Sequence, residues 1–290
     1  MRTGTDIKNL ILDFAQQDKR VRVVLLNGSR ANPKIKPDRF QDFDIVFIVD
    51  RLDTFIIDHS WIDIFGKKII SQLPDEMIFG VESTHQKDIS FSYLMLFEDE
   101  NRIDLTLFSK QKIESHFKPD SLTSVWLDKD NLFARLPPSS DADYHIRKPT
   151  EKEFLDTCNE FWWVSTYVVK GLLRGEIIYA KDTLETVVRP MFMKVIEWKV
   201  GIDNDFRVSM GKSGKFLGKY LPGDFYKKIL RTYSNCERED NWKSLLLLAE
   251  IFAEASNFVA DKLQYRINKV EEQNTMSYLK NQYDQQKVYG

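Results

Sequence analysis

Residues 21–49 read VRVVLLNGSRANPKIKPDRFQDFDIVFIV, and this stretch decides the fold of the chain. The β-branched run at 21–26 predicts a strand that ends in the tight turn Asn27-Gly28-Ser29. After a loop interrupted by prolines, residues 42–49 predict a second strand. Two strands that flank a glycine turn and an acidic segment are therefore the centre of the first half.

The surrounding residues extend this centre into a mixed sheet. Strands are expected at 89–97 and 102–108, because two apolar runs flank the polar turn 98–101. Apolar residues at helical spacing predict helices over 5–17 and 56–70. The first half is thus predicted to be one mixed sheet flanked by helices.

The second half has a different pattern. A Pro-Pro-Ser-Ser-Asp linker at 137–141 precedes an almost wholly helical region, and Thr150 with Glu153 forms a capping box before a long apolar-periodic stretch. Asp182 is expected to begin a later helix that Pro190 kinks. The predicted fold class is therefore α+β, with a sheet domain at 1–145, a helical bundle at 146–267 and a polar tail at 268–290.

Composition narrows the function. The 42 basic and 44 acidic side chains give a net charge of -2, which disfavours a nucleic-acid partner and favours a small substrate. No apolar run is long enough to span a membrane, so a cytoplasmic protein without a membrane partner is expected. Cys158 and Cys236 lie far apart and are expected to be buried thiols. The oligomeric state stays open, with a monomer favoured.

Three carboxylates on neighbouring strands are the main chemical feature. Side chains alternate along a strand, so Asp42 and Asp44 point to one face, and Asp104 on a later strand can join them. Like charges held this close repel each other, and a divalent cation removes the conflict. Magnesium prefers such oxygen ligands together with substrate phosphates, so these residues are predicted metal ligands and catalytic groups.

The turn Gly28-Ser29-Arg30 complements the carboxylates. A glycine lets backbone N–H groups approach phosphate oxygens closely, Ser29 adds a hydroxyl donor, and Arg30 is a candidate phosphate clamp. An Asp-x-Asp pair or a Gly-Ser pair alone is common on solvated strand edges. The ordered combination predicts nucleotidyl transfer from a nucleoside triphosphate to a hydroxyl group.

At these residues the sequence resembles the nucleotidyltransferase superfamily and, more closely, the aminoglycoside 6-adenylyltransferases. The resemblance covers most of the chain. It is carried by the Gly28-Ser29-Arg30 turn and by the segments at 40–45, 97–99, 103–107, 127–130, 158–171, 188–190, 209–212 and 242–245.

This resemblance implies a reaction in which ATP and Mg²⁺ adenylylate the 6-hydroxyl of streptomycin, release pyrophosphate and so inactivate the antibiotic, a resistance function. It carries Asp42, Asp44 and Asp104 over as metal ligands, with Asp104 also as the general base.

The helical half offers further candidates. A cationic aminoglycoside needs carboxylates and hydrogen-bond acceptors, so the predicted drug contacts are Glu160, Trp163, Tyr167 and Asp182. The predicted triphosphate ligands are Lys170, Lys212 and Lys215. Core packing for the aromatic residues, a helix cap for Asp182 and plain surface lysines are the structural alternatives.

Two rival functions remain open. One is nucleotidyl transfer to a different hydroxyl acceptor, and the other is a catalytically silent relative that binds nucleotide or drug. Acceptor profiling separates the first, and the three filled acidic positions argue against the second.

Overall fold

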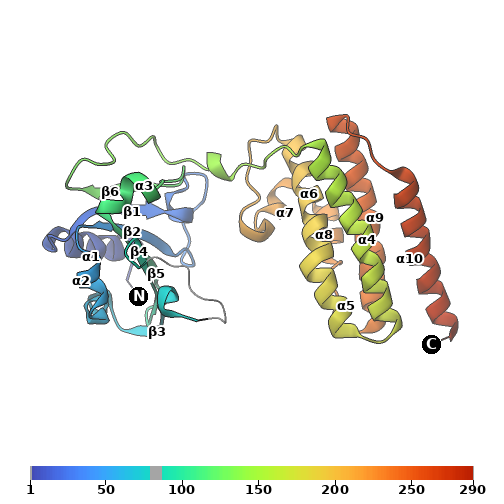
Figure 1. Ribbon diagram of the computed structural model, residues 1–290, viewed down its shortest axis with the longest axis horizontal. Coiled ribbons are helices and arrows are strands. Elements are labelled where there is room, and N and C mark those ends of the chain that lie inside the picture. Colours follow the sequence, from blue (N-terminus) through green and yellow to red (C-terminus); the bar gives the residue numbers. More distant parts are fainter. Residues whose placement is uncertain (1, 79–86, 290) are drawn as a thin grey trace. The chain divides into compact units, whose positions relative to one another are not determined.

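The chain forms two compact units in the computed structural model, which describes residues 2–78 and 87–289 (Figure 1). The units are Met1–Asp143 and Tyr144–Gly290. The expected domains 1–145 and 268–290 include residues 1, 79–86 and 290, which lie outside the described part. The fold is α+β, as predicted, with a mixed sheet in the first unit and helices in the second.

The first unit is built on a six-stranded sheet with the order β3-β4-β5-β2-β1-β6. Strands β2 and β5 are parallel, and the other neighbours are antiparallel. The strands are β1 (Val21–Asn27), β2 (Phe43–Val49), β3 (Lys68–Gln72), β4 (Ser90–Phe97), β5 (Arg102–Ser109) and β6 (Ser124–Asp128). The two strands predicted at residues 21–49 thus pair at the centre of the sheet.

The two faces of this sheet have different partners. One face packs with helix α1 (Gly4–Gln17) around Phe43, Ile45 and Phe47, while the other buries Val46, Ile48 and their neighbours against residues after β5 and β6. Short helices α2 (Asp53–Ile56) and α3 (Ile113–His116) complete the unit. Alternation along β2 therefore assigns Asp44, which lies between Phe43 and Ile45, to the face opposite α1.

The predicted helix over 56–70 is wrong. The chain there forms a 3₁₀ segment, His59–Phe65, and then the edge strand β3. Gly66, at φ 128°, follows the 3₁₀ segment, in a conformation that glycine adopts without strain. Ile64 and Ile69 are exposed, so the apolar spacing that predicted a helix does not mark a buried face.

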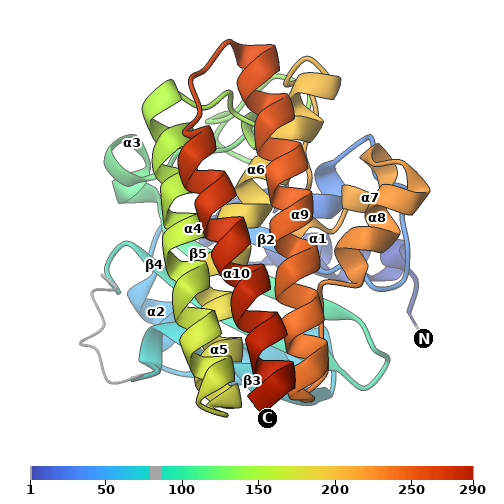
Figure 2. The same cartoon turned by 90° about the vertical axis from the view of Figure 1, so that its right-hand side faces the viewer.

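The second unit consists of helices. They are α4 (Glu151–Leu173), α5 (Ile177–Thr183), α6 (Arg189–Asp203), α7 (Leu217–Tyr220), α8 (Gly223–Leu230), α9 (Arg238–Leu263) and α10 (Lys269–Tyr289). Helices α4, α9 and α10 run side by side (Figure 2). Thr150 caps α4, and the expected capping box with Glu153 is present.

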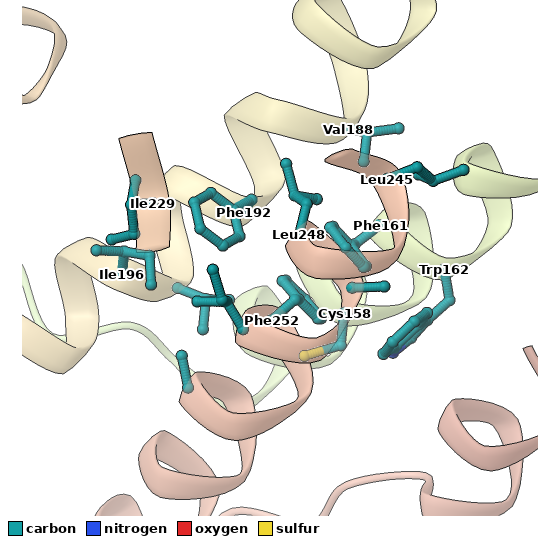
Figure 3. Close-up of a cluster of buried hydrophobic side chains, with 14 of the residues drawn as sticks. Cys158, Phe161, Trp162, Val188, Phe192, Ile196, Ile229, Leu245, Leu248 and Phe252 are labelled. Carbon is teal, nitrogen blue, oxygen red and sulfur yellow. The ribbon is translucent and has the colours of Figure 1, made fainter. Parts of the chain in front are cut away.

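Aromatic side chains form the centre of this unit (Figure 3). Phe161 of α4 stacks on Phe252 of α9 with ring centroids 3.6 Å apart, and Trp162 meets Phe252 edge-on. Both rings of the stacked pair are fully buried, which ties the two longest helices together.

The residues expected to form a polar tail are helical instead. In α10, Leu279 is fully buried and Tyr283 packs against Trp242 at a ring-centroid distance of 5.7 Å. Met276, Leu279 and Tyr283 recur at intervals of three and four residues, a narrow apolar stripe on an otherwise polar helix. This weak periodicity explains why the sequence pattern alone did not predict the helix.

The helix expected to be kinked by Pro190 is continuous: α5 passes through a π-helical turn, Leu184–Val188, directly into α6, whose second residue is Pro190. The run therefore departs from regular α-helix in the turn before the proline, where the ring and the missing N–H disturb the hydrogen-bond ladder. Asp182 lies inside α5 and does not begin a helix.

The two thiols differ in exposure. Both are free, but Cys158 is buried whereas Cys236, also expected to be buried, is exposed. Burial, together with the nearby carboxylates of Glu272 and Glu271, raises the pKa of Cys158 to about 12. A thiol-specific reagent should therefore label one cysteine in the native protein and both after unfolding. Equal native reactivity of Cys158 and Cys236 would contradict the buried position of Cys158 on α4.

In the described part of the chain, no helix is long and apolar enough to cross a membrane.

Candidate active site

The carboxylates of Asp44 and Asp104 stem from directly paired strand positions. Asp44 of β2 is in register with Asp104 of the parallel strand β5, and on its other side with Asn27 of β1. Adjacent strands lie about 4.8 Å apart, and side chains at paired positions share a face. The sheet thus brings together the Asp44 and Asp104 positions that the sequence predicted to be neighbours.

Asp42 lies one residue before β2, on the same side as Asp44 by alternation. Its carboxylate is 3.8 Å from the guanidinium of Arg102. The third predicted carboxylate is therefore at the same end of the sheet, linked to the Asp104 strand through an arginine.

Gly28 is positioned directly against Asp44. It follows β1 at φ 70°, and a Cβ atom at this residue would lie 2.2 Å from Asp44 Oδ2. Only glycine combines this backbone conformation with so close an approach. The turn Gly28–Ala31 is thereby held beside the Asp44 carboxylate.

Arg102 neutralises the carboxylates in this arrangement. Its Nε and Nη2 donate to the two oxygens of Asp104 at 2.7 and 2.8 Å. The hydrogen bond to Asp104 raises the pKa of Arg102, and burial opposes the rise. Sequence analysis missed this residue, although Arg102 and Asp104 are two apart on one strand and share a face.

Arg30 contacts the backbone of the segment that leads into β2. Its Nη2 donates to the Gln41 carbonyl at 2.7 Å, its Nε donates to the Asp42 carbonyl at 3.1 Å, and its guanidinium covers the Phe43 ring at 3.8 Å. Burial lowers the pKa of Arg30, which nearby aspartates counteract. Arg30 therefore holds the Asp42 backbone in place through its Nε and Nη2 groups.

The donor set fits a hard divalent cation in its chemistry, since Asp42, Asp44 and Asp104 offer only carboxylate oxygens from adjoining positions. Among the described residues, no three acidic, histidine or cysteine side chains converge closely enough to enclose an ion. Both oxygens of Asp104 accept hydrogen bonds from Arg102 instead. For Asp104 to bind a metal, its contact with Arg102 must open.

In the second unit, Glu160 borders a cavity of about 630 Å³ between α4 and α6. The cavity is lined by His145, Arg147, Glu153, Asp156, Thr157, Glu160, Met191, Lys194, Glu197 and Trp198. Burial raises the pKa of Glu197, opposed by Lys194. The lining holds four carboxylates against the two cations Arg147 and Lys194, and this acidic excess suits a cationic ligand.

The other predicted drug contacts are not part of this cavity. Trp163 is exposed, and its indole N–H donates to the Tyr167 hydroxyl at 3.0 Å on the same helix. Neither ring is therefore fully buried in the core. Asp182 is exposed on α5, where its carbonyl accepts from Thr186. Trp163 and Tyr167 form one aromatic pair, and Asp182 stands apart from them in sequence and element.

The predicted triphosphate lysines are all exposed. Lys170 lies in the last turn of α4, with its Nζ 5.1 Å from the centre of the Tyr167 ring. Lys212 and Lys215 lie at a short 3₁₀ turn, and Lys215 contacts the Phe216 ring. These lysines occupy two separate segments of the second unit.

The chain matches a family model described as streptomycin adenylyltransferase over residues 1–282. It is 42% identical over 266 residues to an aminoglycoside 6-adenylyltransferase of Campylobacter jejuni, covering 92% of this chain and 91% of that protein. A Bacillus subtilis protein of the same name is 41% identical, covering 92% of this chain and 93% of the relative. A crystal structure of an aminoglycoside 6-adenyltransferase from Bacillus subtilis is 34% identical with a TM-score of 0.47, covering 98% of this chain and 99% of that chain.

Proposed function

Because this chain belongs to the aminoglycoside 6-adenylyltransferase family, a family of nucleotidyltransferase enzymes, we propose that it transfers AMP from ATP to the 6-hydroxyl of streptomycin and releases pyrophosphate. The observation that carries the proposal is the in-register pair Asp44 and Asp104 beside the Gly28 turn. This is the arrangement that a transfer at phosphorus needs: acidic ligands next to a backbone that admits phosphate oxygens.

The catalytic residues act through charge and position. Asp42, Asp44 and Asp104 would hold Mg²⁺, which supplies positive charge beside the triphosphate. The acceptor oxygen attacks the α-phosphorus while the bond from that phosphorus to the β-phosphate oxygen breaks, and Asp104 takes the acceptor's proton. The N–H groups of Gly28 and Ser29 and the Ser29 hydroxyl orient the phosphates. Arg30 supports them indirectly by fixing the backbone of Gln41 and Asp42.

Arg102 is expected to exchange its contact with Asp104 for one with solvent during the reaction. In the unliganded arrangement it balances the Asp104 charge with two hydrogen bonds. Its side chain is 44% exposed, so it can move into solvent, and a bound metal would then balance the charge of Asp104, whose side chain is 21% exposed. We expect it to release Asp104 when the nucleotide and its metal bind.

The acceptor is cationic, so the carboxylate-lined cavity of α4 and α6 is the proposed place for it. Glu160 and Asp156 are its exposed carboxylates, but Asp156 is paired with Lys152, and Glu153 is engaged with Arg147 and Thr150. Trp163 and Tyr167, farther along α4, are proposed to flank the drug, and Asp182, Lys170, Lys212 and Lys215 remain proposed contacts that mutation can test individually.

Glu160→Gln should raise KM for streptomycin by roughly 10-fold or more, because one charge-assisted hydrogen bond to the drug is lost. The kcat value and KM for ATP should stay close to wild type. Glu254→Gln, an exposed change on α9, is the matched control and should alter neither constant. An unchanged KM for streptomycin in Glu160→Gln would remove this residue from the acceptor site.

The proposed regiochemistry is tested on the product. Streptomycin incubated with the enzyme, ATP and Mg²⁺ should gain one AMP group by mass spectrometry, and NMR should locate the new phosphodiester at position 6. Attachment at another hydroxyl would refute the proposed position, and modification of other aminoglycosides alone would refute the proposed acceptor.

A further inference from the structure

The polar row across the sheet continues past the carboxylates. Asn27 of β1 is paired with Asp44, and β1 is in turn paired with β6, where Leu26 is in register with Ser124. Continuing that register by one residue sets Thr123 beside Asn27. The row therefore reads Thr123, Asn27, Asp44, Asp104 across four adjoining strand positions.

Two members of this row have polar atoms without a partner. Asn27 Oδ1 and Thr123 Oγ1 are buried and make no hydrogen bond. Thr123 is only 4% exposed, so its hydroxyl has no access to bulk water. A buried polar atom without a hydrogen-bond partner lowers the stability of the folded protein. A ligand that supplies the missing partner removes this penalty.

Thr123 borders a cavity of about 350 Å³ on the sheet face that carries the carboxylates. Phe133, which helps to line it, belongs to the apolar cluster packed on that face with Val46 and Ile48. Another lining residue, Ser139, donates its hydroxyl to the Ala31 carbonyl at 2.5 Å. The cavity wall is thus fastened to the same short turn that contains Gly28 and Ser29.

The chemistry of the lining indicates the ligand. Apolar side chains and hydrogen-bonding groups contribute about equally to it, the apolar ones being Val125, Phe133, Ala134, Leu136, Pro137 and Pro138. Its one carboxylate, Asp128, already accepts the backbone N–H groups of Asp130 and Phe133. A wall that mixes apolar surface with uncharged hydrogen-bonding groups suits a nucleoside, whereas a polycationic drug would need free carboxylates.

We propose that this cavity binds the nucleoside part of the triphosphate, with Thr123 Oγ1 as its hydrogen-bond partner. The inference rests on the proposed use of ATP, and it adds the residues that would recognise the nucleoside. The triphosphate would lie on the Gly28 turn, and the sugar and base would extend along the sheet toward β6.

Calorimetric titration of the full-length protein with ATP and with inorganic tripolyphosphate, both with Mg²⁺, tests the proposal. Wild type should bind ATP more tightly than tripolyphosphate. Thr123→Val keeps the shape and removes the hydroxyl, so it should weaken ATP roughly five- to tenfold and leave tripolyphosphate unchanged. The same variant should melt at or above the wild-type temperature, because it removes a buried unpartnered group; a purely structural hydroxyl would have the opposite effect.

A second variant fills the cavity from its exposed rim. Ala134→Phe should weaken ATP at least tenfold without affecting tripolyphosphate, and Leu132→Phe, an exposed neighbour that does not line the cavity, should bind both like wild type. Unchanged ATP binding in both Thr123→Val and Ala134→Phe would overturn the inference, as would a parallel loss of both ligands. If these results hold and no aminoglycoside accepts AMP, the nucleoside site stands and only the proposed acceptor falls.

Discussion

Replacing Asp44 with Asn is expected to lower kcat by at least about 10²–10³-fold, the usual loss when one group that stabilises transition-state charge is removed. Asp44 is in register with Asp104 and lies directly against Gly28. Its carboxylate is therefore next to both the proposed metal ligand Asp104 and the proposed phosphate-binding turn. The amide keeps the size of the side chain and removes its charge. Asp42→Asn should have an effect of similar size.

Steady-state pyrophosphate release measures this loss, and thermal melting checks that the fold is kept. Asp13→Asn, an exposed change on α1 in the same unit, should leave both readouts at wild-type values. Near-normal turnover in Asp42→Asn or Asp44→Asn would mean that the metal assignment is wrong.

Gly28→Ala should lower kcat by about 10²-fold, the scale of loss that a displacement of about 1 Å causes in a catalytic group. The new methyl carbon would lie 2.2 Å from Asp44 Oδ2, so either the carboxylate or the turn has to move. The positive φ of 70° adds a strain of about 1–2 kcal/mol for any residue with a Cβ.

Gly175→Ala separates the two causes. Gly175 also has a positive φ, of 73°, but a Cβ there meets nothing within 4 Å. This control should lower the melting temperature and leave kcat unchanged, whereas Gly28→Ala should lower both. A Gly28→Ala enzyme with wild-type kcat would show that the close approach to Asp44 has no role in turnover.

Strand alternation and turn chemistry were sufficient to predict the centre of the first unit. The Asn27-Gly28-Ser29 turn and the period-two pattern around Asp44 are local features, and a sequence displays them directly. The capping box of Thr150 and Glu153 is another local signal, and the structure contains it.

Tertiary pairing explains what was missed. The row that includes Thr123 depends on β6 pairing with β1, which lies about a hundred residues earlier in the chain, and no local pattern encodes that register. The hydrogen bonds from Arg30 to the Gln41 and Asp42 carbonyls form only because the folded chain places these carbonyls beside its guanidinium. The chain over 56–70 was predicted as a helix because periodicity counts apolar residues without knowing which become exposed.

Pyrophosphate release by the purified protein with ATP and Mg²⁺, compared between streptomycin, other aminoglycosides and no acceptor, tests the central claim most directly. We predict release that requires streptomycin and that is lost in Asp104→Asn. Release that persists in Asp104→Asn would contradict the role of the carboxylate row, and ATP binding without release for any aminoglycoside would contradict the proposed acceptor.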